Sequence, residues 1–254
     1  MRRISHLLLA ACLGLVPGLI ESGWAAPARQ LSVEPPILNI GTFYSGGEVT
    51  ISGEVPHWED VVIEIAGPRT DEAFDIKGRV GPFWMTRGRA QVDGAPSMYV
   101  LLLPEGQQWH QQASAFGLGL TMLHNKVAVQ SSSAGTDDLF DMFLKLKQSE
   151  GLYLEKENAV TYTAAANGRR QFKAVYRFPR ATSAGEYTIK ATLVSRGIKD
   201  AEESIAFPVA EVGFTRLVDE LATHRRLIYG ILAVLIALGA GAIMGFLFKG
   251  GGSH

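Results

Sequence analysis

The feature that most constrains this chain is an apolar segment near its C-terminus. Leu227 to Phe248 contains 22 residues without a charged side chain. As an α-helix rising about 1.5 Å per residue, this segment would be about 33 Å long, close to the ~30 Å of a bilayer's hydrocarbon core. Two arginines precede it and Lys249 follows it. The pattern predicts one transmembrane helix over 227–248, so the chain must fold beside a membrane.

Small residues recur every four positions along this predicted helix. They are Ala233, Ala237, Gly241 and Gly245, and they include a GxxxG step. Such a row lets a second helix approach closely, so that van der Waals contact can drive association inside the bilayer. It predicts a helix–helix interface, either for self-association or for another membrane protein. The alternative is a lipid-facing anchor, since glycine and alanine are common in membrane spans.

The N-terminus has the order of a secretory signal peptide, which we predict over residues 1–28. Two arginines precede an apolar run from Leu7 to Ile20, and small residues follow around Ala25 and Ala28. Cleavage after Ala25 and cleavage after Ala28 both fit the pattern. An uncleaved anchor is the alternative, and it would give the same topology for everything downstream.

Together the two ends predict a single-pass protein of the bacterial inner membrane. Its large domain would lie in the periplasm, and residues 249–254 would form a cytoplasmic tail. The arginines before the span oppose this orientation under the positive-inside rule, but translocation of a large domain behind a signal peptide usually dominates.

The single cysteine of the chain, Cys12, lies inside the predicted signal peptide. The residues from Leu9 to Cys12 resemble the box at which bacterial lipoproteins are lipidated, although the apolar run continues past the cysteine. If the signal peptide is removed, the mature protein has no cysteine. Disulfides, thiol catalysis and cysteine metal sites are then excluded.

The charge balance excludes one class of partner. The chain has 24 Lys and Arg against 25 Asp and Glu, for a net charge of −1. A nucleic-acid-binding protein carries a basic excess, so we expect no nucleic-acid partner. The partner that the sequence does require is the lipid bilayer.

The fold class predicted for the exported part is mainly β, with an Ig-like β-sandwich. Residues 29–104 show short alternating strands, as at Val49 and Ile51, separated by turn residues, and suggest a β-sandwich-like domain. Residues 157–212 form a second β-rich segment, in which Phe172 to Phe178 alternate apolar and polar side chains. In this second segment we expect one sheet face to be packed and the other to be largely wet.

Between these segments, residues 105–156 predict a helical insertion. One apolar stripe has spacings of four, three, four and three, weakened by two glycines; it consists of Trp109, Ala113, Phe116, Leu120 and Leu123. A second helix is predicted to begin at Thr136 and to end at Gly151. A further stripe, from Phe214 to Leu221, predicts a juxtamembrane helix within 213–226.

Six short segments carry a family resemblance. They are Gly81 to Met85, Pro96 to Tyr99, Gly151 to Tyr153, Gly185 to Thr188, Val212 to Phe214, and Leu227 to Gly230. In this order and spacing they resemble the alphaproteobacterial putative transmembrane protein family, whose members carry a signal peptide and a single span. That family has an aliphatic residue and Asn after the tryptophan, where this chain has Met85 and Thr86. The resemblance implies no assigned activity, but a gene neighbourhood that often includes membrane exporters of the sulfite and organosulfonate type.

No catalytic constellation stands out in the sequence. His110 and His124 would lie about 21 Å apart on one continuous helix, too far to share a metal, and no HExxH spacing occurs. Trp84, Tyr99 and Trp109 are candidates to line a ligand groove. The simpler interpretation makes them core and rim aromatics of a β domain.

Two function hypotheses follow. The first is a non-enzymatic periplasmic binding or accessory protein without cofactor or metal, which assists a membrane transporter of the sulfite or organosulfonate exporter type. The second is a periplasmic enzyme or metal-dependent sensor whose polar residues converge only in the fold, near Trp84, His110 and Glu150. Buried, mutually bonded ionisable groups in a pocket would favour the second hypothesis, and scattered exposed groups would favour the first.

Overall fold

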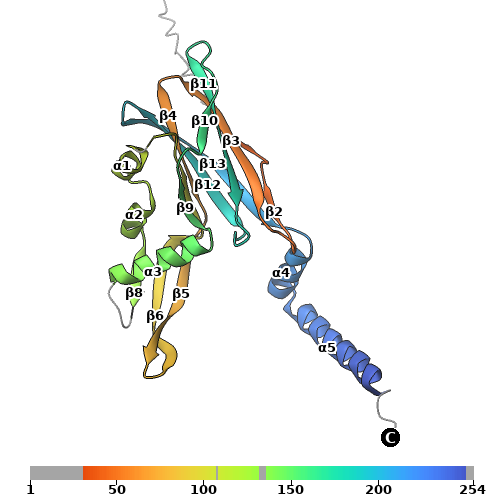
Figure 1. Cartoon of the computed structure of the whole chain (residues 1–254). Coiled ribbons are helices and arrows are strands. Elements are labelled where there is room, and N and C mark those ends of the chain that lie inside the picture. Colours follow the sequence, from red (N-terminus) through yellow and green to blue (C-terminus); the bar gives the residue numbers. More distant parts are fainter. Residues whose placement is uncertain (1–30, 107, 132–135, 250–254) are drawn as a thin grey trace, which may run out of the picture.

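The computed structural model describes residues 31–106, 108–131 and 136–249. The predicted signal peptide, Cys12 and most of the predicted tail lie outside these residues. Strands dominate the described part, and one long apolar helix follows them at the C-terminal end (Figure 1). The prediction of a mainly β fold with one C-terminal apolar helix is confirmed.

Two sheets build the main body. Sheet A is antiparallel and has the order β1 (Ser32–Glu34), β3 (Gly47–Pro56), β11 (Arg169–Phe178) and β10 (Val160–Tyr162). Sheet B has the order β2 (Leu38–Ile40), β13 (Ile198–Glu211), β12 (Gly185–Ser195), β4 (Glu59–Ala66), β7 (Tyr99–Leu102) and β9 (Tyr153–Lys156). In sheet B the two outermost strands, β2 and β9, run parallel to their neighbours, and the inner pairs are antiparallel.

The two β-rich segments read from the sequence interleave within these sheets. Strand β3 of the first segment pairs with β11 of the second, and β4 of the first pairs with β12 of the second. The helical insertion also contributes β9 to sheet B. The divisions at 104 and 157 therefore separate strands that belong to one sandwich.

Aromatic side chains fill the space between the sheets. Phe178 of sheet A lies 5.7 Å from Tyr187 and 5.6 Å from Phe207, ring centroid to ring centroid, and both of these belong to sheet B. All three side chains are buried. Burying an aromatic side chain removes a large apolar area from water, so this contact holds the sheets face to face.

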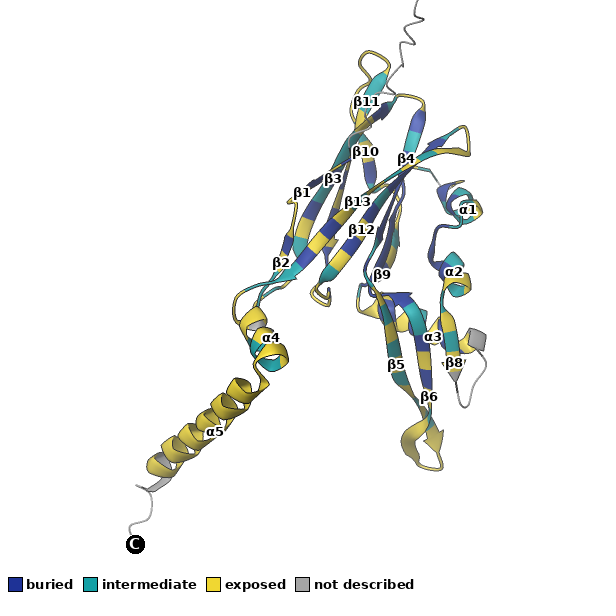
Figure 2. Cartoon of the chain, turned by 180° about the vertical axis from the view of Figure 1, so that it is seen from behind, coloured by how far each residue is buried: buried dark blue, intermediate teal, exposed yellow. Residues whose placement is uncertain are grey.

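A long hairpin leaves the sandwich and forms most of a third sheet. It consists of β5 (Arg69–Val80) and β6 (Phe83–Pro96), and β8 (Ala128–Ser131) pairs with β6 near the base. Helix α3 (Thr136–Ser149) covers that base, where Phe143 stacks on Phe74 with centroids 6.4 Å apart. The other end of the hairpin has no such cover and is exposed (Figure 2).

The first predicted helix is broken in the structure. It forms α1 (Gln108–Ala115) and α2 (Leu120–Leu123), followed by a 3₁₀ turn, η1 (His124–Lys126). Gly117 and Gly119 between the two helices have φ values of 74° and 105°. Those angles suit glycine and end a right-handed helix, yet the buried stripe persists on both pieces.

The second predicted helix, α3, ends as the sequence predicts. Gly151 has a φ of 72°, and the Leu152 N–H donates to the Lys147 carbonyl at 2.9 Å. This is the six-to-one hydrogen bond of a Schellman motif, which satisfies a carbonyl that the helix itself leaves unpaired.

Two helices follow the last strand. The predicted juxtamembrane helix is α4 (Phe214–His224), and the apolar helix is α5 (Arg226–Lys249). The stretch from Arg226 to Phe246 is long and apolar enough to cross a membrane. The backbone at Arg225 leaves the helical region, with φ −130° and ψ 50°, so α4 and α5 are separate helices joined at that residue.

Candidate functional site

The outer face of sheet B, turned away from sheet A, is covered in its centre. Strand β7 is buried along its whole length, and in β4 the residues from Val61 to Ile65 are all buried. The cover is the helical insertion, whose Trp109, Ala113, Leu120 and Leu123 are buried against it. The largely wet second face expected for the strands between 160 and 209 therefore does not extend to β4 and β7, because the insertion lies on them.

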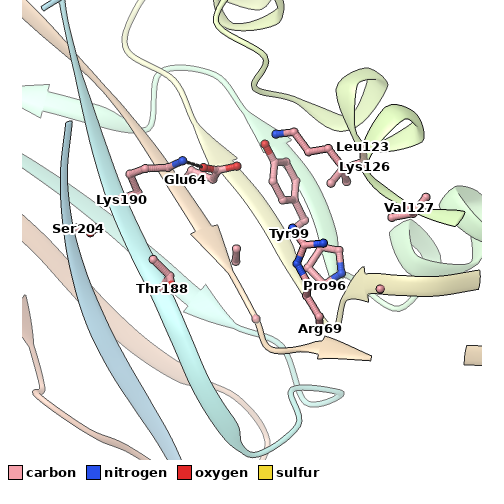
Figure 3. Close-up of a pocket in the computed structure, with 13 residues that line it drawn as sticks. Glu64, Arg69, Pro96, Tyr99, Leu123, Lys126, Val127, Thr188, Lys190 and Ser204 are labelled. Carbon is pink, nitrogen blue, oxygen red and sulfur yellow. Dashed lines mark ion pairs between the residues drawn. The ribbon is translucent and has the colours of Figure 1, made fainter. Parts of the chain in front are cut away.

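A cleft of about 290 Å³ opens at the edge of this cover. It lies between the outer face of sheet B, the α2–η1 segment and the base of the β5–β6 hairpin. Its walls are Glu64, Ala66, Gly67, Arg69, Gly94, Pro96, Tyr99, Leu123, Lys126, Val127, Thr188, Lys190 and Ser204. Figure 3 shows Leu123 and Lys126 on the helical side of Tyr99, with Lys190 and Thr188 on the strand side.

An ion pair between a buried carboxylate and a partly exposed ammonium group forms one wall of the cleft. The Lys190 Nζ of β12 lies 2.7 Å from Glu64 Oε2 of β4, and the Glu64 side chain is only 8% exposed. The strands pair in antiparallel register with Lys190 directly opposite Glu64, so the two side chains leave the same face of the sheet. Removing a carboxylate from water is costly, and the ammonium partner offsets that cost.

Tyr99 stands beside this pair. Burial, and next the negative charge of Glu64, hold the pKa of its phenol well above the ordinary value of 10. The phenol is therefore protonated at neutral pH. Its oxygen accepts a hydrogen bond from the Gly119 N–H at 2.9 Å, which ties the break between α1 and α2 to sheet B.

Two further cations line the cleft. Lys126 Nζ donates to the Gly117 carbonyl at 2.8 Å and keeps donor capacity for a ligand. Among the described residues, Arg69 has no side-chain hydrogen bond or ion pair of its own. With Lys190 balanced by Glu64, the ionisable side chains of the cleft leave an excess of two positive charges.

His110 fixes the insertion to the sheet. Its Nδ1 lies 3.1 Å from Glu155 Oε2 and its Nε2 lies 2.7 Å from Glu157 Oε1. The other oxygen of Glu155 accepts from the Leu120 N–H, at 2.6 Å, at the start of α2. The interactions of His110 and Glu155 therefore position the helices that roof the cleft.

The structure does not bring the three predicted groove aromatics together. Tyr99 lines the cleft. Trp109 belongs to α1, its side chain is buried, and its indole N–H donates to the Glu105 carbonyl at 3.1 Å. Trp84 is 74% exposed at the far end of the β5–β6 hairpin. The other cluster proposed from the sequence, Trp84 with His110 and Glu150, does not converge either, since these residues lie at the far end of the β5–β6 hairpin, on α1 and after the end of α3.

The two halves of the row of small residues on α5 have different surroundings. Ala233 and Ala237 line an apolar groove of about 620 Å³ between α5 and α4, together with Leu217 and Leu221 and their apolar neighbours. Gly241 and Gly245 have open space where a side chain would lie. The first half of the row thus faces α4, and the second half faces nothing within the described chain.

Glu64, Lys190, Arg69 and Lys126 were not identified as site residues from the sequence. Their position depends on the pairing of β4 with β12 and on the path of the insertion, which no local pattern reveals. One local signal existed: Glu64 interrupts the apolar run from Val61 to Ile65, and a charge in such a run is buried when both faces of the strand are covered. In the described part of the chain, no group of three or more His, Cys, Asp and Glu residues is arranged to hold a metal ion.

Comparison with known proteins adds one match. A family model described as "Putative transmembrane protein (Alph_Pro_TM)" matches residues 30–250, which include every described strand and helix. No curated protein matches the chain.

Proposed function

The chain belongs to the Alph_Pro_TM family of putative transmembrane proteins, and from that premise we propose that it is a membrane-anchored, non-enzymatic binding module. Its cleft takes a small anion and holds it beside the membrane for an integral membrane partner. The domain lies in the periplasm, as the signal-like residues 1–28 suggest, and the C-terminus lies in the cytoplasm.

The single observation that carries this proposal is the charge of the cleft. Arg69 and Lys126 supply donors that the Glu64–Lys190 pair does not neutralise. A guanidinium group binds planar or tetrahedral oxyanions through two parallel hydrogen bonds, which are stronger than bonds between neutral groups. The volume of about 290 Å³ is at the lower end for ligand sites, so the ligand is small.

The family resemblance narrows the anion to a chemical class. It implies a gene neighbourhood with exporters of sulfite and organosulfonates, whose anionic groups are small oxyanions. An accessory protein beside such an exporter would bind its substrate and contact the exporter within the bilayer. The groove between α4 and α5, and the open positions Gly241 and Gly245, offer apolar surface for that contact.

Binding of sulfite and of methanesulfonate to the full chain in detergent micelles, measured by calorimetry, tests the anion site. Arg69→Gln should weaken binding by about tenfold, since ~1.4 kcal/mol is a fair estimate for one lost charge-assisted contact. Arg87→Gln is the matched control, because it removes an arginine of the same hairpin outside the cleft. Equal affinities of the two variants would show that the anion does not bind in the cleft.

Partner contact through the span has its own test. Gly241→Ile with Gly245→Ile keeps α5 apolar but holds a neighbouring helix away from the backbone, so recovery of the exporter, or of a second copy, after cross-linking in the membrane should fall several-fold. Leu235→Ile with Leu238→Ile is the control, since it changes shape away from the small-residue row. If both double variants cross-link equally, α5 is a plain anchor.

The enzyme hypothesis keeps one supporting observation, the buried and mutually bonded Glu64 and Lys190 beside Tyr99. We favour binding because Lys190 already pairs with Glu64, whereas Arg69 and Lys126 keep donors that a bound anion can use. Hydrolysis of a bound sulfonate ester by water that is lost in Glu64→Gln would reverse this preference.

A further inference from the structure

The free end of the β5–β6 hairpin exposes large apolar side chains. The hairpin closes with a two-residue turn, Gly81 and Pro82, in which the φ of Gly81 is 62°. Around the turn lie Val80, Phe83, Trp84 and Met85, which are between 49% and 74% exposed. We call residues 80–85 the hairpin tip. A soluble protein seldom leaves such a cluster in water unless it contacts something there.

The apolar side chains occupy both faces of the tip. Val80 pairs with Phe83 on one face, and Met85 follows on the same face, opposite Gly78. Trp84 lies on the other face, where it pairs with Arg79. A folded protein partner offers a surface that covers one face of a hairpin. A fluid apolar medium surrounds both faces at once, and the tip fits that medium better.

Basic side chains form a collar next to the tip. Between residues 75 and 89 the hairpin carries Lys77, Arg79, Arg87 and Arg89 against the single acidic residue Asp75, a net charge of +3. Within the described part of the chain, only Arg89 among these four has an acidic partner, with its Nε 3.5 Å from Asp75 Oδ1. Anionic lipid headgroups attract such a cluster, and long basic side chains reach headgroups while apolar neighbours sit deeper.

The hairpin points toward the membrane that α5 requires. In Figures 1 and 2 the hairpin and α5 project from the same end of the sandwich, and the hairpin tip reaches down to the level of α5. The 12 residues of β5, at about 3.3 Å each, give the hairpin a length of about 40 Å. Although α5 slants away from the hairpin, a bilayer crossed by α5 lies on the side of the sandwich toward which the hairpin extends.

We infer that the hairpin tip inserts at the interface of the bilayer leaflet that α5 first enters, with the basic collar on anionic lipid headgroups. Tryptophan prefers that depth. Deeper insertion is disfavoured, because the strand edges carry backbone groups that hydrocarbon cannot satisfy. The domain then has two attachments to one membrane, α5 and the tip, and the cleft at the hairpin base is held at a fixed orientation above the lipid.

Quenching of tryptophan fluorescence by brominated lipids tests this placement. The full chain is reconstituted into vesicles of phosphatidylglycerol and phosphatidylcholine whose acyl chains are brominated near the headgroup. In a Trp24→Phe background, which removes the tryptophan of the predicted signal peptide, we expect emission to be quenched, and Trp84→Phe to abolish the quenched component. Trp58→Phe is the control: Trp58 is also exposed, but it lies in the β3–β4 turn at the opposite end of β4 from the hairpin.

The basic collar provides a second test of the same placement. Arg79→Gln with Arg87→Gln should reduce the quenching at low salt in the anionic vesicles by several-fold, and should change it little in vesicles of phosphatidylcholine alone. Quenching that is the same with and without Trp84 would overturn the inference. So would a photo-cross-linker at position 84 that captures a second copy or another protein instead of lipid.

Discussion

The two faces of sheet B use the same strands in different ways. On the inner face, toward sheet A, most buried side chains of β4, β12 and β13 are apolar, as at Ile63, Ile189 and Phe207; the buried Glu59, at the start of β4, is a charged exception. On the outer face, the same strands carry Glu64, Lys190 and Glu202, linked by ion pairs and partly covered by the helical insertion. Burial of apolar side chains on the inner face stabilises the fold. Holding charges beside a cleft on the outer face costs part of that stability.

The difference shows how a sheet can separate folding from function. Apolar contact is nondirectional and tolerates many arrangements, so the inner face specifies the sandwich and little else. Partly buried charges need partners in defined positions, and such partners make a site. If this division holds, changes on the inner face should affect stability most, and changes on the outer face should affect it less and depend on pH.

The largest effect should come from the inner-face contact that joins the sheets. Phe178→Ala removes the ring that packs on Tyr187 and Phe207, and should destabilise the fold by about 3–5 kcal/mol. Urea unfolding of the full chain in micelles, followed by near-ultraviolet circular dichroism, measures the loss.

A matched control lies three residues earlier on the same strand. Val175 of β11 points away from the core and is 37% exposed. Val175→Ala should cost only about 0.5 kcal/mol. If Val175→Ala and Phe178→Ala cost the same, the aromatic contact between the sheets is not what holds them together.

The sequence predicted the inner face better than the outer face. Period-two alternation in β11 and β12 identified the inward residues, because side chains in a strand alternate between two faces. The same reasoning did not reveal the cover over the outer face of β4 and β7. The unbroken apolar run from Tyr99 to Leu103 was the available signal, since a strand buried on both faces has no alternation.

The candidate site could not be predicted in the same way. Glu64 and Lys190 are 126 positions apart and meet only because β4 pairs with β12 in one particular register. The insertion was expected as a helix, but the turn at Gly117 and Gly119 that directs it over the cleft depends on the Tyr99 hydroxyl and on Glu155. Short-range patterns contain none of these long-range contacts.

An intermediate effect should come from breaking the ion pair of the outer face. Lys190→Met leaves Glu64 buried without its cation, and should cost about 3 kcal/mol in urea unfolding, at the lower end for such pairs because Lys190 is partly exposed. Replacing both partners, Glu64→Met with Lys190→Met, should return stability to within about 1 kcal/mol of the unchanged protein. A double variant no more stable than Lys190→Met would mean that the pair has no energetic coupling.

The smallest effect concerns the exposed edge of the outer face and depends on pH. Lys199 Nζ lies 2.6 Å from Glu202 Oε1, and this hydrogen bond, opposed by slight burial, lowers the pKa of Glu202 below its ordinary 4.5. A carboxyl whose pKa is lower in the folded state adds stability at pH values above its unfolded pKa, and that stability is lost as the pH falls through the folded pKa.

Since Glu202 is mostly exposed, we expect Glu202→Gln to cost only about 0.5 kcal/mol at neutral pH. The difference between the two proteins should shrink toward zero once the pH has fallen below the lowered folded-state pKa of Glu202, where Glu202 is protonated in both states. Urea unfolding at a series of pH values measures it, with Glu186→Gln as a control on the same face of sheet B. A difference that is constant across that range would show that Glu202 acts through its shape and not through its charge.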